Sequence, residues 1–205
     1  MEGPASDGFD FTAHMRHVCA DIVARMPEFA HIDLDRVAIR WCQARRGTRY
    51  GIQASLTPMR FEQGATEMTR RGRRWTIQPV VDAEGREMLY LLSFYLPRFL
   101  NLAMEEKLAT VCHELWHVSA AFDGDLRRHE SQRYYAHGPC EKQFHAAMQA
   151  MARQWLDRSP PTWLFDPLRH NFRALHRRYG RVYGTCIPTP KLVPVTTTGS
   201  RLAAP

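Results

Sequence analysis

The spacing of apolar positions changes twice along the chain and divides it into helical, strand-rich and helical regions. Between residues 11 and 26 apolar side chains recur about every 3.6 residues, which predicts an amphipathic helix that Pro27 ends. Short runs of β-branched and aromatic residues follow, and these predict strands. The predicted strands are residues 37–42, 50–56, 75–81 and 88–95, with a turn at 82–86.

The helical spacing returns at residue 103. One apolar stripe there predicts a helix that stops at Asp123-Gly124, because glycine tolerates the left-handed backbone that ends helices. Further helices are predicted over 141–156 and from a cap at Asp166-Pro167 to about Tyr179. The stripe consists of Leu108, Val111, Leu115, Val118 and Phe122.

This order of elements predicts an α+β fold, with a small mixed sheet packed against the helix of residues 103–123 and further helices after it. The 205 residues, 44% of them hydrophobic, suit one domain, which we place at residues 10–182. Residues 183–205 are rich in Pro, Thr, Gly and Ser and predict an extended or disordered tail.

No run of 18 apolar residues occurs, and the first residues lack the basic and apolar regions of a secretory signal. We therefore expect a soluble, cytoplasmic protein without membrane contact. The five cysteines are odd in number and form no CxxC pair, which argues against a disulfide framework and a zinc ribbon.

Twenty-eight Lys and Arg against 21 Asp and Glu give a net charge of +7. Arginines gather at residues 70–74, and Arg169, Arg173 and Arg177 are spaced to share one face of the last predicted helix. Weak, salt-sensitive contact with nucleic acid is one expectation, and a solvated basic face or an acidic partner is the other.

Residues 113–117 read HELWH, an HExxH motif on a predicted helix. Because four residues make about one helical turn, His113 and His117 point the same way and can hold one metal ion. Glu114 lies about 100° around the helix, where it can reach a water molecule beside that metal. The pattern predicts Zn²⁺ with an open position, Glu114 as general base, and a nearby strand at 88–95 that offers an edge to an extended peptide.

A catalytic zinc site needs a third protein ligand, and several residues compete for that place. His137 is our first candidate, because 20 residues allow the chain to leave the helix and return to the metal. Asp123 stands where elongated HExxH motifs place a third ligand, but Ala120 replaces the glycine that would bend the chain there. The other competitors are His129, Glu130 and Glu141.

Around this motif the sequence resembles the zinc metallopeptidases of phage and prophage genomes over about residues 90–157. The shared features are the HELxH helix, the FDG turn at 122–124, paired arginines at 127–128 and the HG at 137–138. More distantly, it is similar to the SprT-like peptidases. The resemblance implies a zincin fold, zinc-dependent peptide-bond hydrolysis and His137 as third ligand. The four-cysteine ribbon of many SprT-like proteins is missing, since only Cys140 and Cys186 follow the motif.

Other residues near the motif have two interpretations each. Asp123 can accept a hydrogen bond from a ligand histidine or be a solvated charge, and Tyr135 or Tyr134 can donate to an oxyanion or simply pack. His145 we interpret as structural or exposed. The expected function is a zinc metallopeptidase acting on protein or peptide. The alternatives are a nucleic-acid-associated protein whose metal is structural, its fourth position closed by Cys140 or Glu141, and a phage or host interaction protein without metal.

Overall fold

The structure is a computed structural model that describes residues 8–44, 51–128 and 141–196, and of Glu141 only the backbone. His129, Glu130, Tyr134, Tyr135, His137 and Cys140 lie outside the described residues. The α-helices are α1 (Phe11–Arg25), α2 (Met104–Trp116), α3 (Glu141–Asp157), α4 (Thr162–Phe165) and α5 (Phe172–Tyr179). The strands are β1 (Phe9–Asp10), β2 (Val37–Gln43), β3 (Ala54–Pro58), β4 (Glu67–Arg70), β5 (Arg73–Ile77), β6 (Tyr90–Leu96), β7 (Val182–Tyr183) and β8 (Leu192–Pro194). Short 3₁₀ helices are η1 (Pro27–Phe29), η2 (Leu34–Arg36), η3 (Glu62–Gly64), η4 (Phe99–Asn101) and η5 (Pro167–Arg169).

These elements confirm the predicted α+β class. The central sheet has the order β2-β6-β3, in which β2 runs parallel to β6 and β3 runs antiparallel to it. Strand β6, which overlaps the predicted run 88–95, is therefore the middle strand and cannot offer a free edge to a peptide. The prediction of an open edge at 88–95 is wrong; the edge beside the helices is β3.

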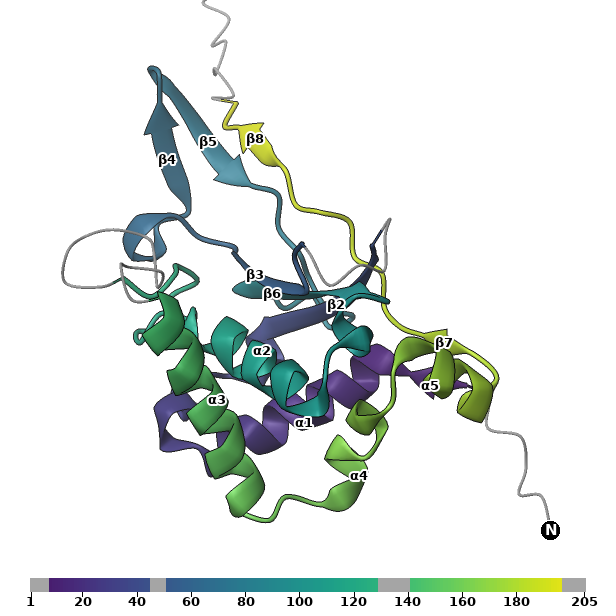
Figure 1. The fold of residues 1–205 in the computed structure, drawn as a ribbon. Coiled ribbons are helices and arrows are strands. Elements are labelled where there is room, and N and C mark those ends of the chain that lie inside the picture. The colour runs from purple at the N-terminus through teal and green to yellow at the C-terminus, as the bar shows by residue number, and fades with distance from the viewer. Residues whose placement is uncertain (1–7, 45–50, 129–140, 197–205) are drawn as a thin grey trace, which may run out of the picture.

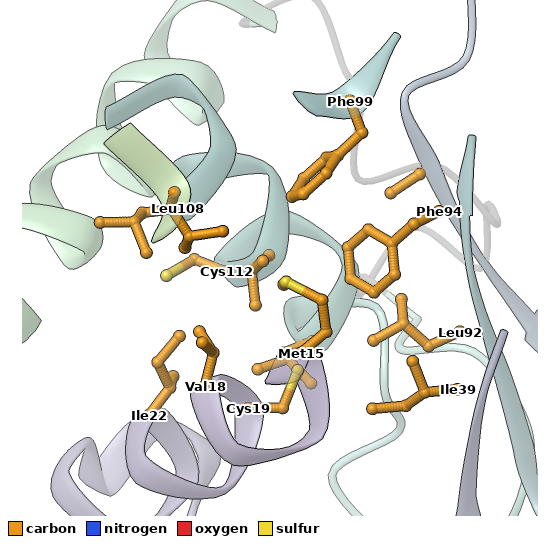
Figure 2. Close-up of a cluster of buried hydrophobic side chains, with 14 of the residues drawn as sticks. Met15, Val18, Cys19, Ile22, Ile39, Leu92, Phe94, Phe99, Leu108 and Cys112 are labelled. Carbon is orange, nitrogen blue, oxygen red and sulfur yellow. The ribbon is translucent and has the colours of Figure 1, made fainter. Parts of the chain in front are cut away.

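Helices α1, α2 and α3 lie on one side of this sheet, and α2 crosses beneath β3 (Figure 1). The apolar stripe that predicted α2 faces inward, since Leu108, Val111, Leu115 and Val118 are all buried. Figure 2 shows how side chains of two helices and of the central sheet meet in one core. Met15, Val18, Cys19 and Ile22 of α1 lie against Leu108 and Cys112 of α2 and against Ile39, Leu92 and Phe94 of the sheet.

The second sheet has the order β4-β5-β8 and extends away from the body of the molecule (Figure 1). Strand β4 was not predicted, because its arginine-rich end looked like a break between strands. Arg71 and Gly72 both have positive φ, 53° and 71°, as the two-residue hairpin turn between twisted strands requires.

The segment from 184 to 196 is extended and follows the sheets. The amide of Trp41 in β2 donates to the carbonyl of Thr185, and Arg40 donates to the Ile187 carbonyl at 2.6 Å. Further along, the amide of Gln78 donates to Lys191 before β8 joins β5. Residues 184–196 are therefore hydrogen-bonded to both sheets.

Helix α2 ends at Trp116, seven residues before the predicted stop at Asp123-Gly124, so that boundary is wrong. After His117 the chain turns back on itself: the His117 carbonyl accepts the amide of Arg127 at 2.8 Å, and Val118 bridges to Leu126. Phe122 keeps the helical spacing in sequence but has a φ of 50°, outside any helix.

The last predicted helix, from Asp166 to Tyr179, is also wrong in its first part. Asp166 closes α4, a 3₁₀ turn follows, and α5 begins only after Asn171, whose side chain accepts the amide of Ala174. Arg169 therefore does not share a helix with Arg173 and Arg177. It pairs instead with Asp166 at 3.4 Å. No helix among residues 8–44, 51–128 and 141–196 is long and apolar enough to cross a membrane.

Candidate functional site

The last turn of α2 and its C-cap residue, His117, carry the HExxH motif, and the opposite face of the helix fixes it to the core. In the first turn of the helix the carboxylate of Glu106 accepts the amide of Ala103, the N-cap residue, at 3.0 Å. Its first turn is acidic, which complements the positive end of the helix dipole. Because Leu108, Val111 and Leu115 pack inward, the row on the other side is held in a defined direction.

His113 and His117 stand one turn apart on that outer row. Their ring centroids are 4.8 Å apart with an angle of 69° between the ring planes. Two imidazoles that bind one tetrahedral zinc ion, each through a nitrogen about 2 Å away, have centroids about 5 Å apart. The pair therefore fits the geometry of two zinc ligands. Phe144 of α3 contacts the His113 ring at a centroid distance of 5.1 Å and closes one side.

Glu114 points from α2 toward the edge of the central sheet. Its Oε2 accepts a hydrogen bond of 2.8 Å from the backbone amide of Leu56 in β3. The side chain is buried, with 7% exposed. Burial raises the pKa of Glu114 to about 7, while the bond from Leu56 acts in the opposite direction. A carboxyl group with a pKa near neutrality can both take up and release a proton.

His113 and Glu114 open onto one pocket of about 440 Å³ between β3, α2 and α3. Such a volume accommodates a few side chains of an extended peptide. The other lining residues are Ile52, Gln53, Ala54, Leu102, Glu106, Ala109, Thr110 and His145.

Two polar lining residues, Glu106 and Gln53, were not singled out from the sequence, and His145 was interpreted only as structural or exposed. Glu106 lies on the same row as Thr110, His113 and His117, so extending that row by one turn would have found it. His145 is exposed on α3, and it also borders the pocket. Nothing in the sequence links Gln53 or His145 to the motif, because the packing of α3 and β3 around α2 brings them there.

Among the residues that the structure describes, no three His, Cys, Asp or Glu side chains come together as a metal-binding group. Asp123 does not join His113 and His117, and its Oδ1 accepts the amide of Asp125 at 3.1 Å. The bond from a ligand histidine to Asp123 stays a prediction. So does the third ligand, because His137 and His129 lie outside the described residues and the side chain of Glu141 is not described.

The turn after the motif is held by a residue that the sequence did not indicate, Asp125. This carboxylate has 4% of its surface exposed and accepts the amide of Gln63 and the guanidinium of Arg128, each at 3.0 Å. Tyr90 of β6 adds two bonds: its hydroxyl donates to the Asp125 carbonyl and accepts the Gly124 amide. These contacts fasten the chain that leaves the motif to the central sheet.

Comparison with protein-family models, with curated proteins and with solved structures finds no match to this chain. The resemblance to phage metallopeptidases and to SprT-like peptidases therefore rests on the motif residues alone.

Proposed function

We propose that this protein is a zinc-dependent metallopeptidase of the zincin type, in which His113 and His117 hold the metal and His137 completes the ligand set. The observation that carries the proposal is the pair of imidazoles, 4.8 Å apart, beside the buried carboxylate of Glu114, which borders the same pocket as His113. Two nitrogen ligands with an acidic neighbour form the donor set that catalytic zinc sites use.

Zinc, when bound, supplies a Lewis acid that polarises the scissile carbonyl and lowers the pKa of a water molecule. Glu114 takes the proton of that water and passes it to the leaving amine. Its Oε2 accepts the Leu56 amide, which leaves Oε1 as the oxygen without this bond. The backbone bond also fixes the carboxylate plane relative to β3.

A peptide substrate would lie in the pocket beside β3, the edge strand of the central sheet. An extended chain can form backbone hydrogen bonds along such an edge, while the pocket receives alternate side chains. His145 stands at the border of the pocket, where its ring can donate a hydrogen bond to the oxygen on which negative charge develops.

Zinc content measured by mass spectrometry tests the proposal. Wild-type protein purified with zinc present should hold about one zinc per chain, and His113→Ala and His117→Ala should lose it. His176→Ala, an exposed histidine on α5, is the matched control and should keep the metal. A wild type without zinc, or His113→Ala and His117→Ala variants that retain as much as the control, would remove the basis of the proposal.

The third ligand is tested in the same series. His137→Ala should lower the zinc affinity at least tenfold, since even the loss of a hydrogen-bond partner of a metal ligand costs about 10- to 100-fold. If His129→Ala has this effect and His137→Ala does not, His129 is the third ligand and the assignment of His137 is wrong.

A further inference from the structure

The sheet β4-β5-β8 has a face on which arginines flank a tryptophan. In the antiparallel pairing of β4 with β5, Arg70 lies opposite Arg73 and Met68 lies opposite Trp75. Cross-strand partners share a face, and so do residues two apart along a strand. These four side chains therefore form one surface, which we call the arginine–tryptophan face.

The charge of this sheet is strongly one-sided. It carries Lys191 and the four arginines of residues 70–74, against the single acidic residue Glu67. Glu67 is paired with Arg74 through a contact of 2.6 Å. Among the described residues, Arg70, Arg71 and Arg73 form no ion pair, so their charge is available to a partner.

The sheet adds little to the stability of the domain. None of the residues of β4, β5 and β8 is buried, and the hairpin projects beyond the helices and the central sheet (Figure 1). Beside Trp75 lies a hollow of about 480 Å³, lined by Met68, Arg70, Arg71, Arg73, Trp75 and Leu192. An ordered three-stranded sheet without a buried side suits contact with a partner.

We propose that the arginine–tryptophan face binds single-stranded nucleic acid. Guanidinium groups bind phosphates with two parallel hydrogen bonds, and the partly exposed indole ring of Trp75 offers a surface on which a base can stack. The Arg73 guanidinium lies 5.9 Å from the centre of the Trp75 ring, so phosphate and base contacts would fall within one nucleotide of each other. This inference is independent of the proposed hydrolysis.

The hollow favours a nucleic acid over an acidic protein as partner. Carboxylates need only the guanidinium groups, and would leave the partly exposed Trp75 and the exposed Leu192 without a role. A base fills such a hollow and covers the ring. The two-residue turn at Arg71 and Gly72 defines the backbone from which the arginines at the tip project.

Fluorescence anisotropy with a labelled 20-nucleotide oligothymidine tests the proposal over a series of salt concentrations. The combined variant Arg70→Ala, Arg71→Ala and Arg73→Ala should bind more than tenfold more weakly than wild type at low salt. The slope of log K against log salt should become shallower by about 2, since each phosphate contact on a single strand contributes about 0.7. The matched control removes the same charge elsewhere, through Arg169→Ala, Arg173→Ala and Arg177→Ala, and should bind like wild type.

A second variant tests the stacking contact. Trp75→Leu keeps an apolar side chain on the sheet and should weaken binding by about 5- to 100-fold, the usual contribution of one stacked base. The circular dichroism spectrum should be that of wild type for every variant, because none of the changed side chains is buried.

The proposal is overturned if wild type does not bind the oligonucleotide at low salt, if both triple variants bind equally, or if Trp75→Leu binds like wild type. Labelled polyglutamate of the same charge should bind much more weakly than the oligonucleotide. If it binds as tightly, the face serves an acidic protein and the assignment to nucleic acid is wrong.

Discussion

The Oε2 atom of Glu114 accepts a hydrogen bond of 2.8 Å from the amide of Leu56, which ties the acidic residue of the motif to the edge of the central sheet. Two substitutions separate the structural part of this contact from the proposed chemistry. Glutamine keeps an acceptor for the Leu56 amide but cannot take a proton from water. Leucine of similar size removes both functions.

We therefore expect Glu114→Gln to unfold at nearly the same urea concentration as wild type, to keep its zinc, and to lose hydrolysis of an unfolded protein substrate by at least a hundredfold. Urea unfolding, zinc content and a gel-based cleavage assay measure the three quantities. A Glu114→Gln variant as active as wild type would exclude Glu114 as the base.

Glu114→Leu should instead destabilise the fold, because the half-buried Leu56 amide loses its partner. The expected loss in the free energy of unfolding is about 1–3 kcal/mol relative to Glu114→Gln. Equal stability of the two variants would show that the amide finds another partner, and would contradict a structural role for this contact.

The Tyr90 hydroxyl joins β6 to the turn after the motif, and Tyr90→Phe removes only that oxygen. The Gly124 amide and the Asp125 carbonyl then lose a partner in a buried environment. We expect the free energy of unfolding to fall by about 1–3 kcal/mol. Tyr95→Phe is the control: its hydroxyl lies 3.4 Å from Ser55 Oγ in a half-buried place, and its loss should cost about 0.5 kcal/mol or less. Equal losses in urea unfolding would contradict the special role of Tyr90.

The fold was predictable from sequence wherever one face of an element packs on the core. The predicted helix 11–26 and strand 37–42 agree with α1 and β2 to within one residue at each end, because their apolar spacing follows from burial on one side. The end of α2 was not predictable in this way. Val118 and Phe122 continue the helical spacing, while the contacts that turn the chain back come from Tyr90 and Asp125. Tyr90 is distant in sequence and Asp125 is polar, so apolar spacing does not reveal either contact.

The site was predictable to the extent that it lies on one helix. His113, Glu114 and His117 follow from the geometry of a single turn, whereas Gln53 and His145 depend on how β3 and α3 pack against α2. A motif within one element can be found from spacing, but residues that reach a pocket from other elements require the tertiary structure.

Acid should destabilise the protein through His14. This residue of α1 is 9% exposed, and its Nε2 donates to the Leu164 carbonyl at 2.9 Å. Burial lowers the pKa of His14 from 6.5 to about 4. Because the unfolded chain takes up the proton first, the stability that the neutral ring provides is complete above pH 6.5 and is lost as the pH falls toward 4. The shift corresponds to about 3 kcal/mol.

His14→Gln keeps a neutral donor for Leu164 and removes the titration, so its free energy of unfolding should fall less between pH 7 and pH 4.5 than that of wild type. Urea unfolding at several pH values measures the difference, with the exposed His176→Gln as control. If His14→Gln and wild type lose stability in parallel, His14 is not the group responsible.

The C-terminal segment should loosen when Arg40 is replaced. Arg40 lies in β2 with 5% of its surface exposed, and its guanidinium donates to Ser93 Oγ at 2.8 Å, to the Ile187 carbonyl at 2.6 Å and to Thr189 Oγ1 at 3.1 Å. Arg40→Met keeps most of the apolar stem but removes these bonds, and hydrogen bonds from a charged donor contribute about 1.5–3 kcal/mol each.

Because local opening controls cleavage in a folded protein, trypsin should cut the Arg40→Met variant after Lys191 at least tenfold faster than it cuts wild type. Mass spectrometry of the early fragments measures this rate, and the exposed Arg173→Met is the control that should leave it unchanged. Equal cleavage rates in both variants would mean that the segment is held by its backbone bonds to Trp41 and Gln78 and not by Arg40.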